Sequence, residues 1–110
     1  MAKIWVDDVR PAPAGYTWCK SVNEVKEFIV LQKIAKSYQK HYSGNFSDIE
    51  LIDIDHDAGK YAHDGGDYIK ILDWLEETGR SYPIRIHSMN PVGVENMRRI
   101  IQRNGWTEVR

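Results

Sequence analysis

The chain has 110 residues, of which 42% are hydrophobic and 28% charged, a size that fits one compact domain burying roughly 60 to 70% of its unfolded surface. Its 15 basic and 16 acidic residues leave a net charge of −1. A nearly neutral chain lacks the field that steers a protein to a nucleic-acid backbone or an anionic membrane. We therefore expect a single domain over residues 1–110, with no extended nucleic-acid surface and no membrane partner.

The single cysteine, Cys19, excludes an internal disulfide and suits a reducing compartment. The opening residues, MAKIWVDD, lack the long apolar core of a signal peptide. No stretch approaches the roughly 18 uncharged apolar residues that a spanning helix requires. These features predict a cytoplasmic protein.

Two short strands are expected first in the chain. Residues 3–7, KIWVD, form an apolar run stopped by acids, which is typical of a buried strand. Prolines and a glycine in residues 9–15 exclude regular structure, and residues 16–20, YTWCK, resume with β-prone side chains. A parallel crossover usually takes about a dozen residues. This connection is shorter and has no helix, so either the loop is unusual or the second strand is misassigned.

A helix and a third strand follow. Ser21 and Glu24 form a capping box, and apolar residues at helical spacing predict a helix from there to about Tyr42, ended by the sequence SGN. Residues 48–54, DIELIDI, are the next strand. Three more acids, Asp53, Asp55 and Asp57, alternate at and beyond its carboxyl end.

The second half continues the alternation of helices and strands. Gly65 and Gly66 lie in a polar loop. After them we expect a helix over 68–79 with Gly79 as its C-cap, a strand over 82–88, a helix from an Asn90 N-cap and Pro91 to about Gly105, and an edge strand over 106–109. This order predicts an α/β domain with a mostly parallel sheet.

Polar residues follow three of the predicted strands. They are Asp7 and Asp8 after the first, Asp55, His56 and Asp57 after the third, and His87 and Ser88 after the fourth. Ligands of open α/β sheets bind beyond the carboxyl ends of the strands. We therefore expect these three segments, far apart in the sequence, to meet in space.

The acids of this group predict a metal site. Asp7, Asp8 and Asp55 would repel one another unless a hard divalent cation with oxygen ligands, Mg²⁺ first and Mn²⁺ second, lay among them. The alternative is that one acid pairs with Arg10 or caps a turn. For Asp53 two interpretations stay open, a part in the metal or catalytic site and an outward-facing or N-cap-like bystander, and Asp57 either supports its neighbours or offers its backbone carbonyl to the metal.

Two histidines suit proton transfer. His56 and His87 lie at two strand ends beside acids or a hydroxyl, and an imidazole titrates near neutral pH, so the pair could serve as general base and general acid. Either one could instead be a structural histidine. His41 and His63 have no such neighbours and are expected at the surface.

An anion site is expected after the fourth strand. Ser88 offers a hydroxyl, and the backbone amides from Asn90 to Gly93 open a helix, which is where phosphate groups bind. Asn90 can be a simple N-cap and still lie beside a phosphate. Gly59 is expected in a turn, and Asp67 is expected as an acid in the first turn of its helix.

Four segments, WVDDVRPAPAGYTW, IDIDHDAG, GGDYIKILDWLEE and IRIHSMNPVGVENM, resemble the cyclic-phosphate-processing receiver domain family, over nearly the whole chain. The resemblance implies a receiver-like (flavodoxin-like) three-layer sandwich with a five-stranded sheet of order 2-1-3-4-5. It also implies that a loop replaces the first receiver helix, which explains the short connection. The family activity implied is the processing of cyclic phosphates, such as a 2′,3′-cyclic nucleic-acid end or a cyclic nucleotide.

The resemblance implies that each candidate site residue corresponds to a functional position of the family. Asp7 and Asp8 match the acidic pair of the receiver metal site, Asp55 the phosphoacceptor, and Ser88 the hydroxyl residue of the fourth strand. The positions specific to the cyclic-phosphate family are His56, Asp57, His87 and Asn90, of which Asp57 and Asn90 are expected to contact the bound group.

The chain also departs from the receiver pattern. Receivers carry a lysine on the fifth strand, where this chain has GWTEVR with only Arg110, and this difference argues against ordinary phosphorelay signalling. Ala58 replaces an apolar residue usual after DHD, and KYAHDGG forms a longer polar loop.

Three functions therefore compete. The first is a metal-dependent phosphoesterase that opens a cyclic phosphate on a small molecule or a nucleic-acid end. The second is a receiver-like module in which Asp55 accepts a phosphoryl group or the pocket senses a phosphorylated ligand. The third is an interaction domain with a relict site and an aromatic surface supplied by the four tryptophans.

Overall fold

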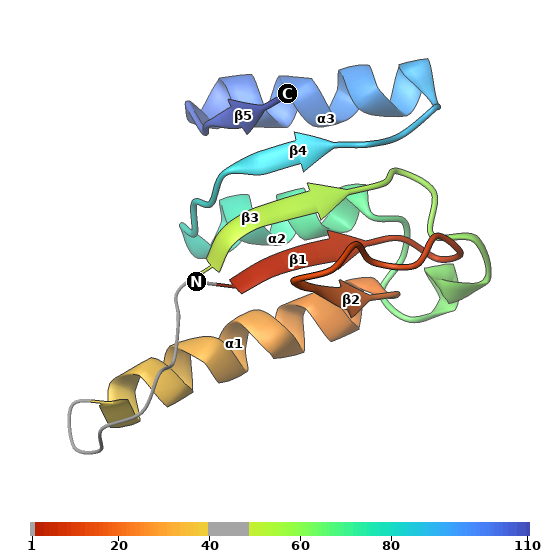
Figure 1. Ribbon diagram of the computed structural model, residues 1–110. Coiled ribbons are helices and arrows are strands. Elements are labelled where there is room, and N and C mark those ends of the chain that lie inside the picture. The colour runs from red at the N-terminus through yellow and green to blue at the C-terminus, as the bar shows by residue number, and fades with distance from the viewer. Residues whose placement is uncertain (1, 40–48) are drawn as a thin grey trace.

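The computed structural model describes residues 2–39 and 49–110. Its five strands are β1 (Ala2–Val6), β2 (Tyr16–Cys19), β3 (Ile49–Ile54), β4 (Ile84–Ile86) and β5 (Glu108–Val109). They form one sheet in the order β2-β1-β3-β4-β5, and every neighbouring pair is parallel. Figure 1 shows that the strands point toward one edge, from which the loops after β1, β3 and β4 leave. The predicted sheet and its strand order are confirmed.

The connection between β1 and β2 is a helix-free loop, as expected. β1 and β2 pair in parallel with Trp5 opposite Trp18. Both indoles tie down the chain that joins them, because Trp5 Nε1 donates to the carbonyl of Arg10 at 2.9 Å and Trp18 Nε1 to that of Asp7 at 2.8 Å. These side-chain hydrogen bonds fix the ends of a connection that has no secondary structure of its own.

Three helices cover one face of the sheet. They are α1 (Val22–Gln39), α2 (Ile69–Thr78) and α3 (Pro91–Asn104); a short 3₁₀ helix, η1 (Gly59–His63), lies in the polar loop. The crossovers from β2 to β3, from β3 to β4 and from β4 to β5 all move along the sheet in the same direction, toward β5. Because such crossovers are right-handed, their helices lie on the same face of the sheet. Accordingly α1 packs on α2, and α2 on α3. The described residues therefore form one helical layer and lack the second layer of the expected three-layer sandwich.

The helix ends follow the predicted capping signals. The amide of Glu24 donates to Ser21 Oγ at 3.1 Å, and Asn90 Oδ1 accepts from the amide of Gly93 at 3.0 Å. Gly79 and Gly105 adopt the left-handed conformation that ends α2 and α3. The predicted end of the first helix near residue 42, at SGN, lies outside the described residues.

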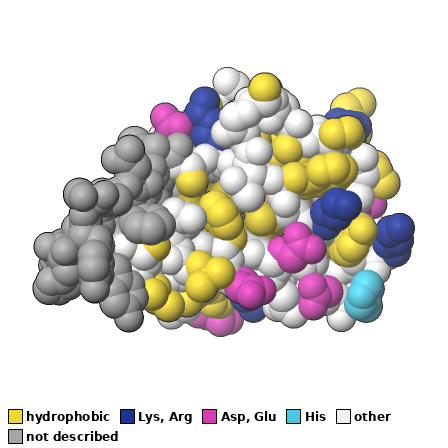
Figure 2. Space-filling view, turned by 60° about the horizontal axis from the view of Figure 1, so that its bottom comes forward, with side chains coloured by type: hydrophobic (Ala, Val, Ile, Leu, Met, Phe, Trp, Pro, Cys, Tyr) yellow, Lys and Arg dark blue, Asp and Glu magenta, His cyan; other side chains and the backbone are white. Residues whose placement is uncertain are grey.

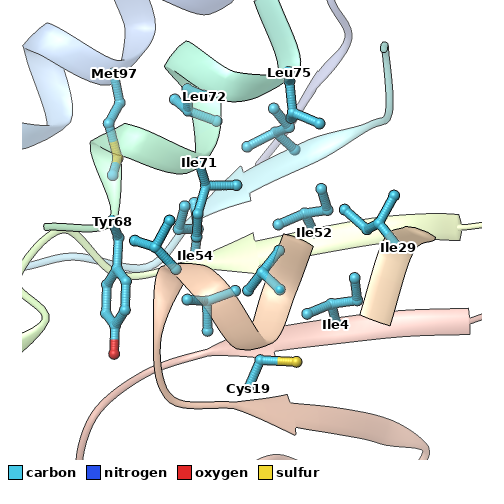
Figure 3. Packing of buried hydrophobic residues seen from close by; sticks show 14 of the residues in the cluster. Ile4, Cys19, Ile29, Ile52, Ile54, Tyr68, Ile71, Leu72, Leu75 and Met97 are labelled. Carbon is cyan, nitrogen blue, oxygen red and sulfur yellow. The ribbon is translucent and has the colours of Figure 1, made fainter. Parts of the chain in front are cut away.

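The core lies between this helical layer and the sheet. Figure 3 shows side chains of β1 and β3 meeting those of α1 and α2. The fully buried apolar residues include Ile4, Val6, Ile52, Ile54, Val25, Ile29, Ile71, Leu72, Leu75 and Met97. Burying each such side chain contributes about 1.5 to 3 kcal/mol relative to exposure. In the described parts of the chain, no helix is long and apolar enough to span a bilayer.

Alkaline pH should weaken this core through Cys19. The thiol is 3% exposed, and its burial, aided by the charge of Glu24, raises its pKa from 9.0 to about 12. Unfolding then releases a proton above pH 9, so stability is full below that pH and declines toward pH 12. We expect urea unfolding to show a loss of up to about 1.4 kcal/mol per pH unit above pH 9 from this group. The same measurements on Cys19→Ala should show a shallower slope; an equal slope would contradict the assignment.

Candidate functional site

Three strand ends bring one residue each to a common point. The amide of Asp55 donates to the carbonyl of Val6 at 2.9 Å, and the amide of His87 donates to that of Ile54 at 2.9 Å. These backbone bonds continue the parallel ladders by one residue beyond β3 and β4. As a result, ligand atoms of Asp7, Asp55 and His87 all lie within 4.8 Å of one another. The predicted meeting of the three segments is confirmed.

Asp7 is the most enclosed acid of this group, with no exposed surface. Its Oδ1 accepts from the amides of Val9 at 3.0 Å and Arg10 at 2.8 Å, and its Oδ2 lies 3.0 Å from His87 Nε2. Burial alone would raise the pKa of Asp7, but the hydrogen bonds from the amides of Arg10 and Val9 and the contact with the His87 ring lower it overall. One oxygen thus caps the turn after β1, as the alternative interpretation had it, while the other faces the centre of the site.

His87 is held on three sides. Its side chain is 8% exposed, and its Nδ1 lies 2.7 Å from Asp53 Oδ1 while its Nε2 faces Asp7. The ring also stacks on Trp5 at a centroid distance of 3.9 Å and an interplanar angle of 2°. These contacts leave the imidazole one orientation, with Nε2 toward the acids.

The interpretation of Asp53 as an outward-facing bystander is wrong. Asp53 has no exposed surface, and besides His87 it binds Arg85 Nη1 through Oδ2 at 3.1 Å. Strand alternation places Asp53 and Asp55 on the same face of β3, since they are two residues apart. That face carries the site, so the alternation of the acids in the sequence was itself the missed signal.

Asp8 lies one step away from this group, against the loop after β3. A Cβ on Gly59 would lie 2.4 Å from Asp8 Oδ2, and Gly59 has a φ of +56°, so a side chain there would displace the carboxylate. The phenol of Tyr68, buried beside the site, has a pKa raised by burial and then by the charges of Asp8, Asp7 and Asp55. The acids therefore combine into one negative field, although Asp8 is not among the three groups within 4.8 Å.

His56 lies on the opposite side, against the first turn of α3. Its Nδ1 lies 2.9 Å from Asp57 Oδ1 and 3.4 Å from Asn90 Nδ2. Its amide donates to Asp55 Oδ1 at 2.8 Å. Nδ1 is thus occupied, and Nε2 has no hydrogen-bond partner among residues 2–39 and 49–110. Nε2 is the ring atom through which His56 can exchange a proton.

Gly93 makes room for the His56 ring. A Cβ at this position would lie 2.3 Å from His56 Cγ and 2.7 Å from Nδ1, closer than real Cβ contacts allow. We expect Gly93→Ala to displace the ring and to cost about 1 to 3 kcal/mol in the free energy of unfolding. Chemical denaturation and the ¹⁵N shifts of His56 would measure the two effects. Glu95→Ala, an exposed change on the same helix, should alter neither, and an undisturbed His56 in Gly93→Ala would contradict the contact.

The helix start at which an anion was expected to bind lies beside His56. Asn90 is the N-cap of α3, and its own amide donates to Ser88 Oγ at 3.1 Å. Ser88 and Asn90 are half-buried. This turn adjoins the acidic group through His87, the residue before Ser88, and it adjoins His56 through the side chain of Asn90. Asp67 differs from its expected place, because it precedes α2 and accepts from the amide of Ala58 at 3.3 Å instead of lying in the first helical turn.

The donor chemistry of the acidic group fits a divalent cation. Two carboxylates and an imidazole are common metal ligands, and within the described ranges no lysine or arginine pairs with Asp7, Asp8 or Asp55. Clustered carboxylates without such compensation are costly. Asp7, Asp55 and His87 could therefore hold a metal ion.

Other predicted surface features are less prominent. His63 is exposed, as expected, and His41 lies outside the described residues. All four tryptophans, Trp5, Trp18, Trp74 and Trp106, are half-buried, so they do not form the aromatic surface suggested for an interaction domain. Figure 2 shows hydrophobic side chains among acidic ones on the side of α1, where Val30, Leu31 and Ile34 are exposed.

Comparison with known families bears directly on this arrangement. Residues 2–103 match the family described as cyclic-phosphate processing receiver domain. The chain belongs to this family. No curated protein and no solved structure matches it. The cyclic-phosphate processing receiver domain thus accounts for the receiver-like strand order, while β5 lies beyond the matched region and carries Glu108 and Val109 where ordinary receivers place a lysine.

Proposed function

We propose that this receiver domain is a metal-dependent phosphoesterase that opens a cyclic phosphate, either a 2′,3′-cyclic nucleic-acid end or a cyclic nucleotide. The observation that carries the proposal is the position of His56 between two complementary surfaces. On one side lies the acidic group of Asp7, Asp55 and His87, and on the other the start of α3. A cyclic phosphodiester needs both a cation for its oxygens and a proton for its leaving oxygen.

Asp7 and Asp55 would hold the cation, with Asp8 beside them. Asp7 Oδ2 and the carboxylate of Asp55 face the common centre, and the backbone carbonyl of Asp57 is proposed as a further oxygen ligand, by analogy with receivers. Bound there, a divalent ion, Mg²⁺ or Mn²⁺, would polarise the phosphoryl oxygens and lower the pKa of a bound water. The buried Asp7 and the backbone-linked Asp55 keep the ligand atoms in place for this task.

His56 is proposed as the proton-transferring residue on the phosphate side. Hydrolysis adds water to phosphorus and breaks one ring P–O bond, and the departing ribose oxygen takes up a proton to leave a phosphomonoester. Asp57 and Asn90 hold Nδ1 of His56, so Nε2 is the ring nitrogen left to exchange a proton with the substrate. His87 serves the cation side instead, because both of its nitrogens face carboxylates.

Ser88 and the amides at the start of α3 are proposed to steady the phosphate. Ser88 Oγ accepts a hydrogen bond from the amide of Asn90, which leaves its own proton for a phosphoryl oxygen. A helix N-terminus favours negative charge as it develops on the phosphoryl group.

The proposal is tested by following a 2′,3′-cyclic mononucleotide and a 3′,5′-cyclic mononucleotide by ³¹P NMR with Mg²⁺, Mn²⁺ or chelator. We expect conversion of at least one to a phosphomonoester with metal and none with chelator. His56→Gln should slow it by about 10²- to 10⁴-fold, the usual contribution of general acid–base catalysis. Tyr16→Phe, remote from His56, should not. Absence of turnover with every metal and both substrates would contradict the proposal.

A receiver-like phosphoacceptor is the second candidate, and the position of Asp55 supports it. Asp55 ends β3 beside Asp7, the arrangement in which receivers accept a phosphoryl group. Beryllofluoride, a phosphoryl mimic, would then bind at Asp55 with divalent metal, and the His56→Gln variant would retain that binding. The absence of a lysine on β5 argues against this candidate.

A further inference from the structure

We propose that His87 is itself a metal ligand through Nε2, that Asp53 holds it in that orientation, and that the site therefore prefers a first-row transition-metal ion such as Mn²⁺ to Mg²⁺. This inference rests on the proposed function, which places a cation among the acids. It goes further because it gives the site a nitrogen donor and a preference among metals.

The contact between His87 and Asp7 points to a cation. His87 Nδ1 lies 2.7 Å from a carboxylate oxygen of Asp53, and a carboxylate can only accept, so Nδ1 carries the proton. In the neutral ring Nε2 then presents a lone pair. That lone pair faces another acceptor, Asp7 Oδ2, at 3.0 Å, with Asp55 within 4.8 Å. Two acceptors so close need a positive centre, a second proton or a metal ion, between or beside them.

Asp53 is placed to fix the ligand and not to bind metal itself. Its two oxygens are occupied by His87 and Arg85, and it has no exposed surface. Trp5, stacked on the ring at 3.9 Å, prevents His87 from rotating away. A carboxylate on the far nitrogen of a metal-binding histidine sets the tautomer and strengthens the ligand. Asp53 is therefore a positioning residue for the metal.

The resulting donor set distinguishes among metals. Mg²⁺ prefers an all-oxygen, largely hydrated shell, whereas an imidazole nitrogen with two carboxylates suits transition-metal ions. An acidic site in which the enclosed, pre-oriented third ligand is nitrogen should gain affinity mainly for the transition metals. Removing the nitrogen while keeping the carboxylates should then lower Mn²⁺ binding more than Mg²⁺ binding.

Equilibrium binding of Mn²⁺ and Mg²⁺ to the purified chain tests this difference. We expect His87→Gln to weaken Mn²⁺ binding by at least about tenfold and Mg²⁺ binding by less than about threefold. Asp53→Asn should weaken Mn²⁺ binding by about 10- to 100-fold, the usual effect of losing the carboxylate that orients a metal-binding histidine. His63→Gln, which removes an exposed histidine in η1, should leave both affinities unchanged. Circular dichroism would confirm that each variant is folded.

Electron spin echo envelope modulation of the Mn²⁺-loaded chain supplies a direct readout. The wild type and His63→Gln should show coupling to an imidazole nitrogen, and His87→Gln should lose it. Mn²⁺ binding without that coupling, or equal losses of Mg²⁺ and Mn²⁺ affinity in His87→Gln, would overturn the inference and leave the proposed function standing. No binding of either ion to the wild type would overturn both.

Discussion

Asp55→Asn should reduce the opening of a cyclic phosphate by at least about 10³-fold. The change keeps the size of the side chain but removes the charge that, with Asp7, would hold the cation. A metal ion contributes several kcal/mol to the transition state, and each 1.36 kcal/mol corresponds to a factor of ten in rate. Steady-state rates with saturating Mn²⁺ would measure the loss.

The Asp55→Asn variant should remain folded. Asp55 is half-buried, and its side chain accepts a hydrogen bond from the amide of His56, which the oxygen of an asparagine side chain can still accept. Removing one of three clustered negative charges also relieves repulsion in the metal-free chain. Asp73→Asn on α2 is the control, with unchanged activity. A folded Asp55→Asn that turned over at the wild-type rate would exclude Asp55 from the reaction.

Asp7→Ala should cost about 3 kcal/mol or more in the free energy of unfolding. The fully buried carboxylate accepts from the amides of Val9 and Arg10, and its removal leaves two donors without their acceptor. The pKa of Asp7 is lowered in the folded chain, so its contribution is present above the ordinary value of 3.8 and is lost as the pH falls below it. Urea unfolding at pH 7 and pH 3 would show a smaller difference from wild type at the lower pH.

Asp8→Ala is a matched control for this change. Asp8 is the next residue, is half-buried and also belongs to the acidic cluster. Its side chain makes no hydrogen bond to residues 2–39 and 49–110, so its loss should change the free energy of unfolding by less than about 1 kcal/mol. Equal effects at the two positions would contradict the role given to the buried hydrogen bonds of Asp7.

The general position of the site followed from the sequence because parallel strands end at one edge. Asp7, Asp55 and His87 each come directly or almost directly after an apolar run, and this pattern alone brought them together. The capping signals at Ser21, Asn90 and Gly105 were equally local and were confirmed. Features that depend on a few neighbouring residues were therefore predictable.

What the sequence did not disclose depends on contacts between distant segments. The burial of Asp53 arises from Trp5 on β1 and from Arg85 and His87 on and just after β4. The alternation of the acids shows which face of β3 they share, but it does not show that one of them is enclosed. The close approach of Gly93 to His56 joins the first turn of α3 to the loop after β3, 37 positions earlier in the chain. A glycine at that position is equally typical of an ordinary helical residue. The single helical layer likewise depends on the handedness of three successive crossovers.

The most direct test of this account is the rate at which a chelator-stripped chain opens a 2′,3′-cyclic mononucleotide before and after Mn²⁺ is restored. We predict no conversion without metal, recovery with Mn²⁺, and no recovery in the Asp55→Asn variant. Conversion that persists without metal, or no conversion at any metal concentration, would contradict the central claim that these strand ends form a metal-dependent cyclic-phosphate site.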